Sequence, residues 1–291
     1  MEYKHLRVNS ERPFVFRLDL DNEVANNTMT DSLYHSIYKC ITALGRNNEC
    51  RAIVISSLGK DFCTGIDLDN LGQFNTDLAS IEDISRRGRS VESRISTIQR
   101  AFVAIERCKK PVIAIIHGAC VGPGMGLITA CDMRYCSTDA WFQVKDVELG
   151  MAADSGTLQR LPKVVGNTSF AREMCFTARR VDAEEALRFG LVNRIFESRQ
   201  QMLNYAIDKA ELIAHLSPVA IQTTKTSILY SQGHTIQEGL DHIVSILLLI
   251  GSSAIFLCSS SQTFCFFVLF SVIGMLWHVR VRTSTSPWDQ L

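Results

Sequence analysis

The chain has 291 residues, of which 46% are hydrophobic and 21% charged, a globular composition that excludes a disordered or collagen-like protein. Its 30 Lys and Arg balance 30 Asp and Glu, and this zero net charge argues against a nucleic-acid-binding protein, which needs a basic surface. Ten cysteines, with no CxxC pair and no zinc-ligand spacing, predict buried reduced thiols and no metal site: Cys40, Cys50, Cys63, Cys108, Cys120, Cys131, Cys136, Cys175, Cys258 and Cys265.

The first part of the chain alternates strand and helix patterns. Phe14–Leu20 places apolar residues on one face of a strand, and Thr28–Leu44 repeats them at helical spacing. Ala52–Ser56 and Pro111–Ile116 are continuous apolar runs, typical of strands buried on both faces of a parallel sheet. Between them, Ile84–Cys108 sets arginines opposite apolar residues, which predicts a surface helix with a solvated basic face. The pattern indicates an α/β fold.

The following part continues as helices with one further strand. No linker interrupts it, so we expect one domain over residues 1–242. The predicted strand is Leu191–Ile195, and the predicted helices are Ser155–Leu161, Ser169–Thr177, Ala183–Phe189, Gln201–Leu216 and Pro218–Gln232.

The last part of the chain, residues 243–291, has a different composition. No residue from Ile243 to Trp277 carries a formal charge. The window 255–277 is long enough for a membrane span and is followed by two arginines, although the polar Ser259–Thr263 interrupts it. A C-terminal helix whose packing sequence has been replaced is the alternative, and the sequence leaves both open.

Two glycine-bearing segments, Phe62–Leu68 and His117–Gly126, are suited to bring backbone close to a ligand. The second is not a dinucleotide-binding fingerprint, because its third glycine is misplaced and it lies in mid-chain. Two backbone N–H groups from such segments, converging beside a helix N-terminus, form an oxyanion hole for a thioester enolate.

At these segments the chain resembles the crotonase (enoyl-CoA hydratase/isomerase) superfamily. The resemblance covers roughly residues 5–242. Its general motifs lie in Ala52–Leu68, Lys110–Asp132 and Phe142–Pro162, and the motifs most similar to the dienoyl-CoA isomerase branch are Cys131–Cys136, Phe142–Lys145 and Ala152–Lys163. It implies a spiral of ββα turns with C-terminal helices, the last of them atypical here, and a trimer or a dimer of trimers.

The resemblance implies a lipid-metabolism enzyme that isomerises 3,5-dienoyl-CoA to 2,4-dienoyl-CoA in unsaturated fatty-acid β-oxidation. Its substrate would be a fatty acyl-CoA, with coenzyme A as part of the substrate and no separate cofactor. The implied compartment is the mitochondrion or the peroxisome. We expect no targeting signal in this chain, because Met1–His5 has no apolar or transit character and Asp289–Leu291 differs from Ser-Lys-Leu.

Carried over by resemblance, the oxyanion site falls on two short stretches. The first donor is the N–H of Ile66, after Thr64 and Gly65. The second falls on Pro123, which has no N–H, so we expect the usual second hydrogen bond to be missing unless Gly124 replaces it.

Three carboxylates follow in the family pattern, and they fall here on Gly126, Asp146 and Asp154. Gly126 has no side chain, and Asp146 has a shorter arm than the usual Glu, for which Glu148 on the same strand face would compensate. The implied proton-transfer pair is Asp146 and Asp154. Hydration is disfavoured, because that branch uses Glu at the positions of Gly126 and Asp146.

Structural interpretations compete with these roles. Asp154 precedes a predicted helix as an N-cap would, and Asp146 and Glu148 alternate like exposed strand charges. Asp132 and His117 are interpreted as structural. The alternative function is a non-catalytic crotonase-fold protein that binds acyl-CoA or a protein partner, because Pro123 and Gly126 replace expected functional positions. The acidic segment Asp21–Val24, where the family is often basic, predicts weaker binding of the coenzyme A phosphates.

Overall fold

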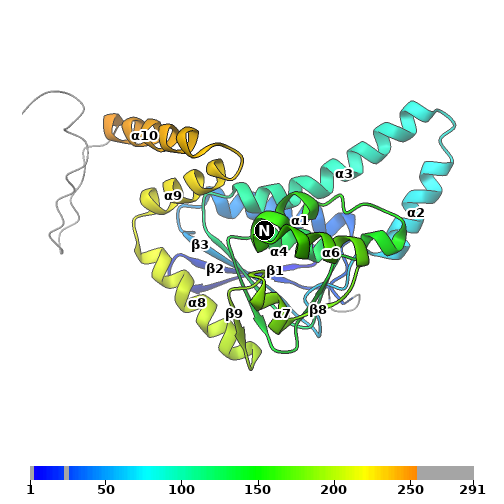
Figure 1. Ribbon diagram of the computed structural model, residues 1–291, viewed down its shortest axis with the longest axis horizontal. Helices are drawn as coiled ribbons and strands as arrows, with labels where there is room; N and C mark the ends of the chain where they lie inside the picture. Colours follow the sequence, from blue (N-terminus) through cyan, green and yellow to red (C-terminus); the bar gives the residue numbers. More distant parts are fainter. Residues whose placement is uncertain (1–2, 23–25, 254–291) are drawn as a thin grey trace, which may run out of the picture. The chain divides into compact units, whose positions relative to one another are not determined.

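The computed structural model describes residues 3–22 and 26–253 (Figure 1). Packing divides the chain into two compact units, Met1–Val244 and Ser245–Leu291. The sheets and the helices up to α9 belong to the first unit, whereas α10 (Ile236–Ser253) runs across the division. The predicted boundary after residue 242 therefore lies inside a helix.

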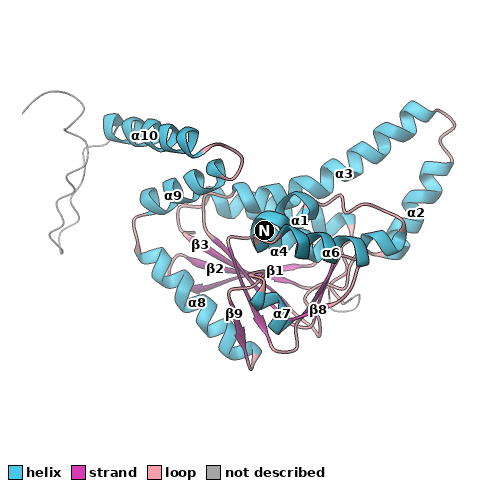
Figure 2. Cartoon of the chain, in the orientation of Figure 1, coloured by secondary structure: helices cyan, strands magenta, loops and turns pink. Residues whose placement is uncertain are grey.

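A six-stranded sheet forms the centre of the first unit (Figure 2). Its order is β1-β2-β3-β4-β6-β9, in which β1 and β2 are antiparallel and every other neighbouring pair is parallel. All residues of β3 and β4 are buried, as their apolar runs predict. The strands are β1 (Leu6–Arg12), β2 (Val15–Leu20), β3 (Ala52–Ser57), β4 (Val112–Ile116), β6 (Met133–Ser137) and β9 (Arg194–Phe196).

The predicted helices are present, with ends shifted by a few residues. Among the α-helices that lie wholly within the first unit, two were not predicted: α2, which buries no residue, and α4, which lies inside the second glycine-bearing segment. The helices of the first unit are α1 (Asp31–Arg46), α2 (Leu68–Ala79), α3 (Ile84–Arg107), α4 (Pro123–Thr129), α5 (Thr157–Val165), α6 (Thr168–Thr177), α7 (Ala183–Arg188), α8 (Arg199–His215) and α9 (Pro218–Ser231).

The large sheet is covered on both faces, as expected for a mostly parallel sheet. On one face, small residues of α8 such as Ala206 and Ala210 pack against Val54 and Ile113. The other face packs against the larger core, which includes α1, α3 and α4 (Figure 1). The only buried residue of helix α9 is Lys225. The Lys225 ammonium lies 2.7 Å from the Asp132 carboxylate and 3.1 Å from the Lys110 carbonyl oxygen. Asp132 is thus structural, as expected.

A second sheet of three short strands brings the candidate segments together. Its order is β5-β7-β8, from β5 (Ala119–Val121), β7 (Trp141–Gln143) and β8 (Val181–Asp182). The β5 strand leads directly into α4. The second glycine-bearing segment is therefore a strand followed by a helix rather than an open loop.

Within the described residues, no helix is both long and apolar enough to cross a membrane. The candidate span at 255–277 lies outside the described residues, as do Cys258 and Cys265. The eight described cysteines are free and buried, as predicted.

Candidate active site

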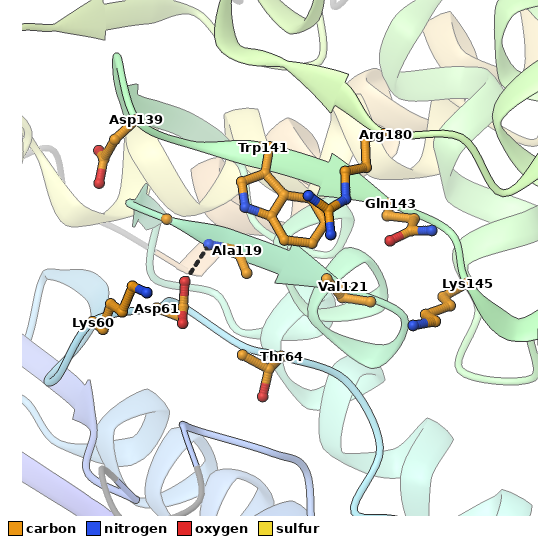
Figure 3. A pocket seen from close by; sticks show the side chains of 11 residues that line it. Lys60, Asp61, Thr64, Ala119, Val121, Asp139, Trp141, Gln143, Lys145 and Arg180 are labelled. Atoms are coloured by element: carbon orange, nitrogen blue, oxygen red, sulfur yellow. Dashed lines mark hydrogen bonds between the residues drawn. The ribbon is translucent and has the colours of Figure 1, made fainter.

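The two glycine-bearing segments run side by side. The Cys63 N–H donates to the Ala119 carbonyl oxygen, and the Val121 N–H donates to the Cys63 carbonyl oxygen, both at 2.9 Å. The Asp61 carboxylate also accepts the Ala119 N–H at 2.8 Å, which Figure 3 shows as a dashed line. These bonds fix the donor candidates of one segment relative to those of the other.

The first segment presents the N–H of Ile66. Gly65 has φ of +117°, a conformation that favours glycine, and its carbonyl oxygen accepts the Met29 N–H at 2.8 Å. The Asp67 N–H donates back to the Met29 carbonyl oxygen at 3.3 Å, so the backbone is held on both sides of Ile66. Among the described residues the Ile66 N–H has no acceptor. This amide is available to a ligand.

The second segment starts a helix where the second donor is expected. Gly122 has φ of +53°, and a Cβ on it would lie 3.9 Å from the Gly65 Cα, so the two segments approach closely here. Pro123 is the first residue of α4. Proline suits this position, because a helix leaves its first N–H groups without partners. The same residue removes the expected donor.

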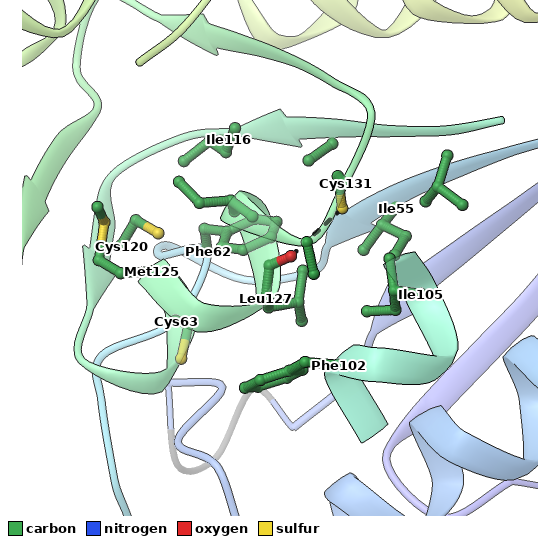
Figure 4. Packing of buried hydrophobic residues seen from close by; sticks show 14 of the residues in the cluster. Ile55, Phe62, Cys63, Phe102, Ile105, Ile116, Cys120, Met125, Leu127 and Cys131 are labelled. Carbon is green, nitrogen blue, oxygen red and sulfur yellow. Dashed lines mark hydrogen bonds between the residues drawn. The ribbon is translucent and has the colours of Figure 1, made fainter. Parts of the chain in front are cut away.

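Gly124, the expected replacement, faces a sulfur atom. Burial raises the pKa of Cys63 to about 12, although the Gly124 backbone beside its sulfur opposes that rise. The Cys63 thiol itself donates to the Gly65 carbonyl oxygen at 3.9 Å. Figure 4 shows Cys63 and Cys120 beside α4, the helix that carries Met125. In this arrangement the Gly124 N–H is directed at Cys63.

The space beside Gly126 is already filled. A Cβ there would lie 2.5 Å from the Ser155 Oγ and 2.9 Å from a ring carbon of Phe102, and both residues are buried. The Ser155 hydroxyl lies 3.2 Å from the Thr157 hydroxyl. A carboxylate at residue 126 therefore does not fit unless these side chains move.

Asp146 lies close enough to Asp154 for the charge of Asp154 to act on it. Burial raises the pKa of Asp146, the negative charge of Asp154 raises it further, and one Asp146 carboxylate oxygen is buried without a partner among the described residues. Partial desolvation also raises the pKa of Asp154, and the positive charge of Arg94 opposes that shift. Two neighbouring carboxyl groups thus have different surroundings.

Arg94 was missed as a site residue, because its helix was interpreted as presenting a solvated basic face. The Arg94 side chain is only 11% exposed. Its Nη2 donates to the Asn70 carboxamide oxygen at 2.7 Å, and its guanidinium lies 4.3 Å from the centre of the Phe74 ring. The interpretation was wrong for this arginine, since α2 covers it, and α2 was not predicted.

Two further interpretations are corrected. Residues Asp146–Leu149 form a 3₁₀ helix, η2, so Glu148 does not share a strand face with Asp146. The Glu148 carboxylate instead lies 3.3 Å from the Gln143 amide nitrogen and 3.8 Å from the Lys145 ammonium. Asp154 is not a helix N-cap, because α5 is preceded by Gly156. His117 is buried and lies 3.2 Å from the Gly59 carbonyl oxygen, as a structural residue would.

A cavity of about 480 Å³ opens next to Thr64, which precedes Gly65 and Ile66 (Figure 3). Three cationic side chains line it, those of Lys60, Lys145 and Arg180, together with the Trp141 ring. The Arg180 guanidinium lies 4.0 Å from the centre of that ring. Among the described residues, no group of His, Cys, Asp or Glu is placed to hold a metal ion.

Comparisons with known proteins agree with this geometry. A family model described as Enoyl-CoA hydratase/isomerase matches residues 12–242. The mitochondrial Delta(3,5)-Delta(2,4)-dienoyl-CoA isomerase of Homo sapiens is 44% identical over 245 residues, which cover 84% of this chain and 74% of that protein. The peroxisomal Delta(3,5)-Delta(2,4)-dienoyl-CoA isomerase of Arabidopsis thaliana is 41% identical over 231 residues, or 79% of this chain and 83% of that one.

Solved structures of enoyl-CoA hydratases share the fold. The crystal structure of enoyl-CoA hydratase from Bacillus anthracis matches with a TM-score of 0.75 at 25% identity, and covers 86% of this chain and 92% of that one. The paired sheets and glycine-bearing segments are those of a crotonase-fold protein. The chain belongs to the enoyl-CoA hydratase/isomerase family.

Proposed function

We propose that the protein is an enzyme that isomerises 3,5-dienoyl-CoA to 2,4-dienoyl-CoA. The observation that carries this proposal is that the carboxyl groups of Asp146 and Asp154 both have raised pKa values and that the charge of Asp154 acts on Asp146. The Ile66 N–H, which has no acceptor among the described residues, supports it. The names of relatives at 44% and 41% identity support the same reaction.

The reaction moves one proton along the acyl chain. A carboxylate removes a proton from C2, and the electron pair of that C–H bond shifts into a conjugated dienolate whose negative charge is concentrated on the thioester oxygen. The Ile66 N–H stabilises that oxygen. A carboxylic acid then protonates C6, the double bonds settle at C2 and C4, and the thioester carbonyl is restored.

The electrostatic environment of each carboxyl group indicates which one is the base and which one is the acid. Asp154 is the base, because the nearby Arg94 favours its ionised form. Asp146 is the acid, because burial and the charge of Asp154 both favour its protonated form. After each turnover the proton taken by Asp154 returns to Asp146, which restores the starting state.

The residues at and around position 126 argue against hydration. Adding water to an enoyl-CoA requires a carboxylate to activate the water, and Gly126 offers none. The Ser155 hydroxyl and the Phe102 ring occupy the adjacent space.

The coenzyme A part of the substrate would lie in the cavity beside Thr64. Lys60 and Lys145 supply positive charge for its phosphates there, which offsets the acidic segment Asp21–Val24. Lys60 belongs to the same loop as the first oxyanion donor, so phosphate binding and thioester placement are linked through a few residues of backbone.

We also propose a homo-oligomer, a trimer or a dimer of trimers. Helices α9 and α10 expose the apolar side chains of Val219, Ile228 and Leu240, which supports an interface there. Light scattering behind size-exclusion chromatography tests this, and a monomer would exclude it. Relatives named mitochondrial and peroxisomal support those two compartments.

The experiment is an ultraviolet assay for the conjugated 2,4-dienoyl-CoA, with Asp154→Asn and Asp146→Asn compared with wild type. Loss of the base or the acid is expected to lower kcat by about 10²–10⁴-fold. Glu148→Gln, an exposed carboxylate two residues from Asp146, is the matched control and should keep wild-type kcat. A folded wild-type protein that binds acyl-CoA without turnover would instead be the non-catalytic binder.

A further inference from the structure

Tyr34 is a buried side chain whose polar end has no partner. It lies on α1 and is 1% exposed, and its hydroxyl has no hydrogen-bond partner among the described residues. Burying a hydroxyl without a hydrogen bond costs about 1–3 kcal/mol, and native proteins seldom do so without a reason. The hydroxyl is therefore placed for a ligand rather than for the fold.

The Tyr34 ring packs against a residue of the candidate site. The Tyr34 ring packs edge-on against Phe102, with ring centres 5.7 Å apart, and Phe102 is the ring that fills the space beside Gly126. Cys63 of the first glycine-bearing segment and the proposed base Asp154 are both close enough to Tyr34 to raise its pKa.

Neighbouring groups show the same unpaired character. Among the described residues, the Arg94 Nη1 and the Asp146 Oδ2 are also buried without hydrogen-bond partners. Arg94 acts electrostatically on both Tyr34 and Asp154, and Asp154 acts on Asp146. The Tyr34 hydroxyl, the Arg94 Nη1 and the Asp146 Oδ2 thus leave three buried polar atoms that a polar part of the substrate could satisfy.

The protonation state of Tyr34 restricts what it does. Burial raises its pKa well above the usual value for a tyrosine, and the charges of Cys63 and Asp154 act in the same direction. The phenol therefore keeps its proton around neutral pH. It is a hydrogen-bond donor and not a base.

The thioester oxygen needs such a donor. Ile66 supplies one N–H, Pro123 supplies none, and the Gly124 N–H is directed at the Cys63 sulfur. We propose that the Tyr34 hydroxyl is the second hydrogen-bond donor to the thioester oxygen, in place of the N–H that Pro123 lacks. This assignment rests on the proposed isomerase function, because it concerns the oxyanion of that reaction.

The variant Tyr34→Phe removes only the oxygen. We expect kcat to fall by about 10²–10³-fold, as for loss of one oxyanion donor, with KM changed only a few-fold. Thermal stability should stay the same or rise, because the variant removes an unpaired buried hydroxyl. Tyr38→Phe is the matched control: Tyr38 lies one turn further along α1, is 41% exposed and should leave kcat unchanged.

A second measurement reads the hydrogen bond directly. Infrared difference spectra of 2,4-dienoyl-CoA labelled with ¹³C at the thioester carbonyl report how strongly the bound carbonyl is polarised. Wild type and Tyr38→Phe should shift the carbonyl band to lower frequency, and Tyr34→Phe should lose much of that shift. An unchanged band in Tyr34→Phe, or full activity of that variant, would overturn the assignment.

The two proposals fail in different ways. If wild type does not isomerise 3,5-dienoyl-CoA but Tyr34→Phe still loses the band shift, the isomerase proposal fails and the donor assignment stands. If wild type is active and Tyr34→Phe matches it, the donor assignment fails and the isomerase proposal stands.

Discussion

The two glycine-bearing segments are hydrogen-bonded to each other, yet they differ in the backbone N–H groups that they offer to a ligand. The first keeps an N–H without an acceptor at Ile66, whereas the second begins its helix with Pro123. Both use a glycine with positive φ, Gly65 and Gly122, to bring their backbones together. A proline at residue 123 therefore distinguishes the second segment, which cannot offer this N–H to an oxyanion, from the first segment, which can. The close approach of the two backbones does not depend on that proline.

This difference shows that fold and function are under separate constraints at residue 123. Proline at the first position of a helix costs no hydrogen bond, and its fixed φ suits the helix start. Stability therefore does not select against it. The catalytic cost appears only when a charge develops next to the missing N–H, so a second donor elsewhere in the site removes that cost.

The largest expected effect comes from restoring the amide. In the Tyr34→Phe background, Pro123→Ala should raise kcat by about 10²–10³-fold, because it returns one oxyanion donor. In the wild-type background the same change should have a much smaller effect, since Tyr34 already supplies the second hydrogen bond. Steady-state kinetics of the four proteins measure this coupling as a double-mutant cycle. Equal effects of Pro123→Ala in both backgrounds would contradict it.

A smaller effect is expected from adding a side chain to the second segment. Gly126→Ala should lower the free energy of unfolding by about 1–3 kcal/mol, because its Cβ would collide with Ser155 and Phe102. Gly88→Ala is the control. Gly88 lies in α3, and a Cβ added to it would meet no atom within 4 Å, so alanine should stabilise by up to about 1 kcal/mol. Urea unfolding measures both, and equal stability of Gly126→Ala and wild type would show that the neighbouring side chains can move.

The pH dependence of kcat/KM should be bell-shaped and displaced upward from ordinary carboxyl groups. Activity should fall as pH drops through the raised pKa of the Asp154 base, and fall again as pH rises through the raised pKa of the Asp146 acid. Each limb should lose about tenfold per pH unit, and both limbs belong to the coupled pair. Arg94→Gln should move the acidic limb upward, because Arg94 opposes the rise in the pKa of Asp154, whereas exposed Arg100→Gln on the same helix should not.

The smallest effect is expected at the cavity beside the first segment. Lys60→Ala should raise KM a few-fold and leave kcat unchanged, because a solvent-accessible charge contributes about 1 kcal/mol or less to binding a phosphate. The increase should shrink at high salt. Lys39→Ala, on the exposed face of α1, is the control. A loss of kcat in Lys60→Ala would mean that Lys60 acts on the thioester end of the substrate.

Much of the fold could be predicted from the sequence, because strands buried on both faces leave a strong signal. Ala52–Ser56 and Pro111–Ile116 are continuous apolar runs, and both are central strands in the structure. Helix α2 carries apolar residues at helical spacing, Leu68, Leu71, Phe74 and Leu78, but it is short and buries no residue, and its signal was not recognised. The short β5 strand and α4 were hidden because glycines dominate their segment.

The candidate site could be predicted only in part. Motif resemblance located Ile66, Pro123 and the carboxylates, since these positions lie in contiguous segments. Tyr34 and Arg94 come from α1 and α3, where apolar and basic periodicity hides them, and only the packing of the helices brings them near Asp154. Ser155 likewise occupies the space beside Gly126 only because the fold brings these two distant parts of the chain together.

The buried cysteines give the molecule a built-in set of reporters on its own motions. Cys40 on α1 and Cys136 on β6 have pKa values raised to about 12 by burial, and only the ionised sulfur reacts with alkylating reagents. Each cysteine should therefore be modified only when its own element opens to solvent. Timed alkylation followed by peptide mass analysis would rank helices and strands by the free energy of local opening, with no label introduced into the protein.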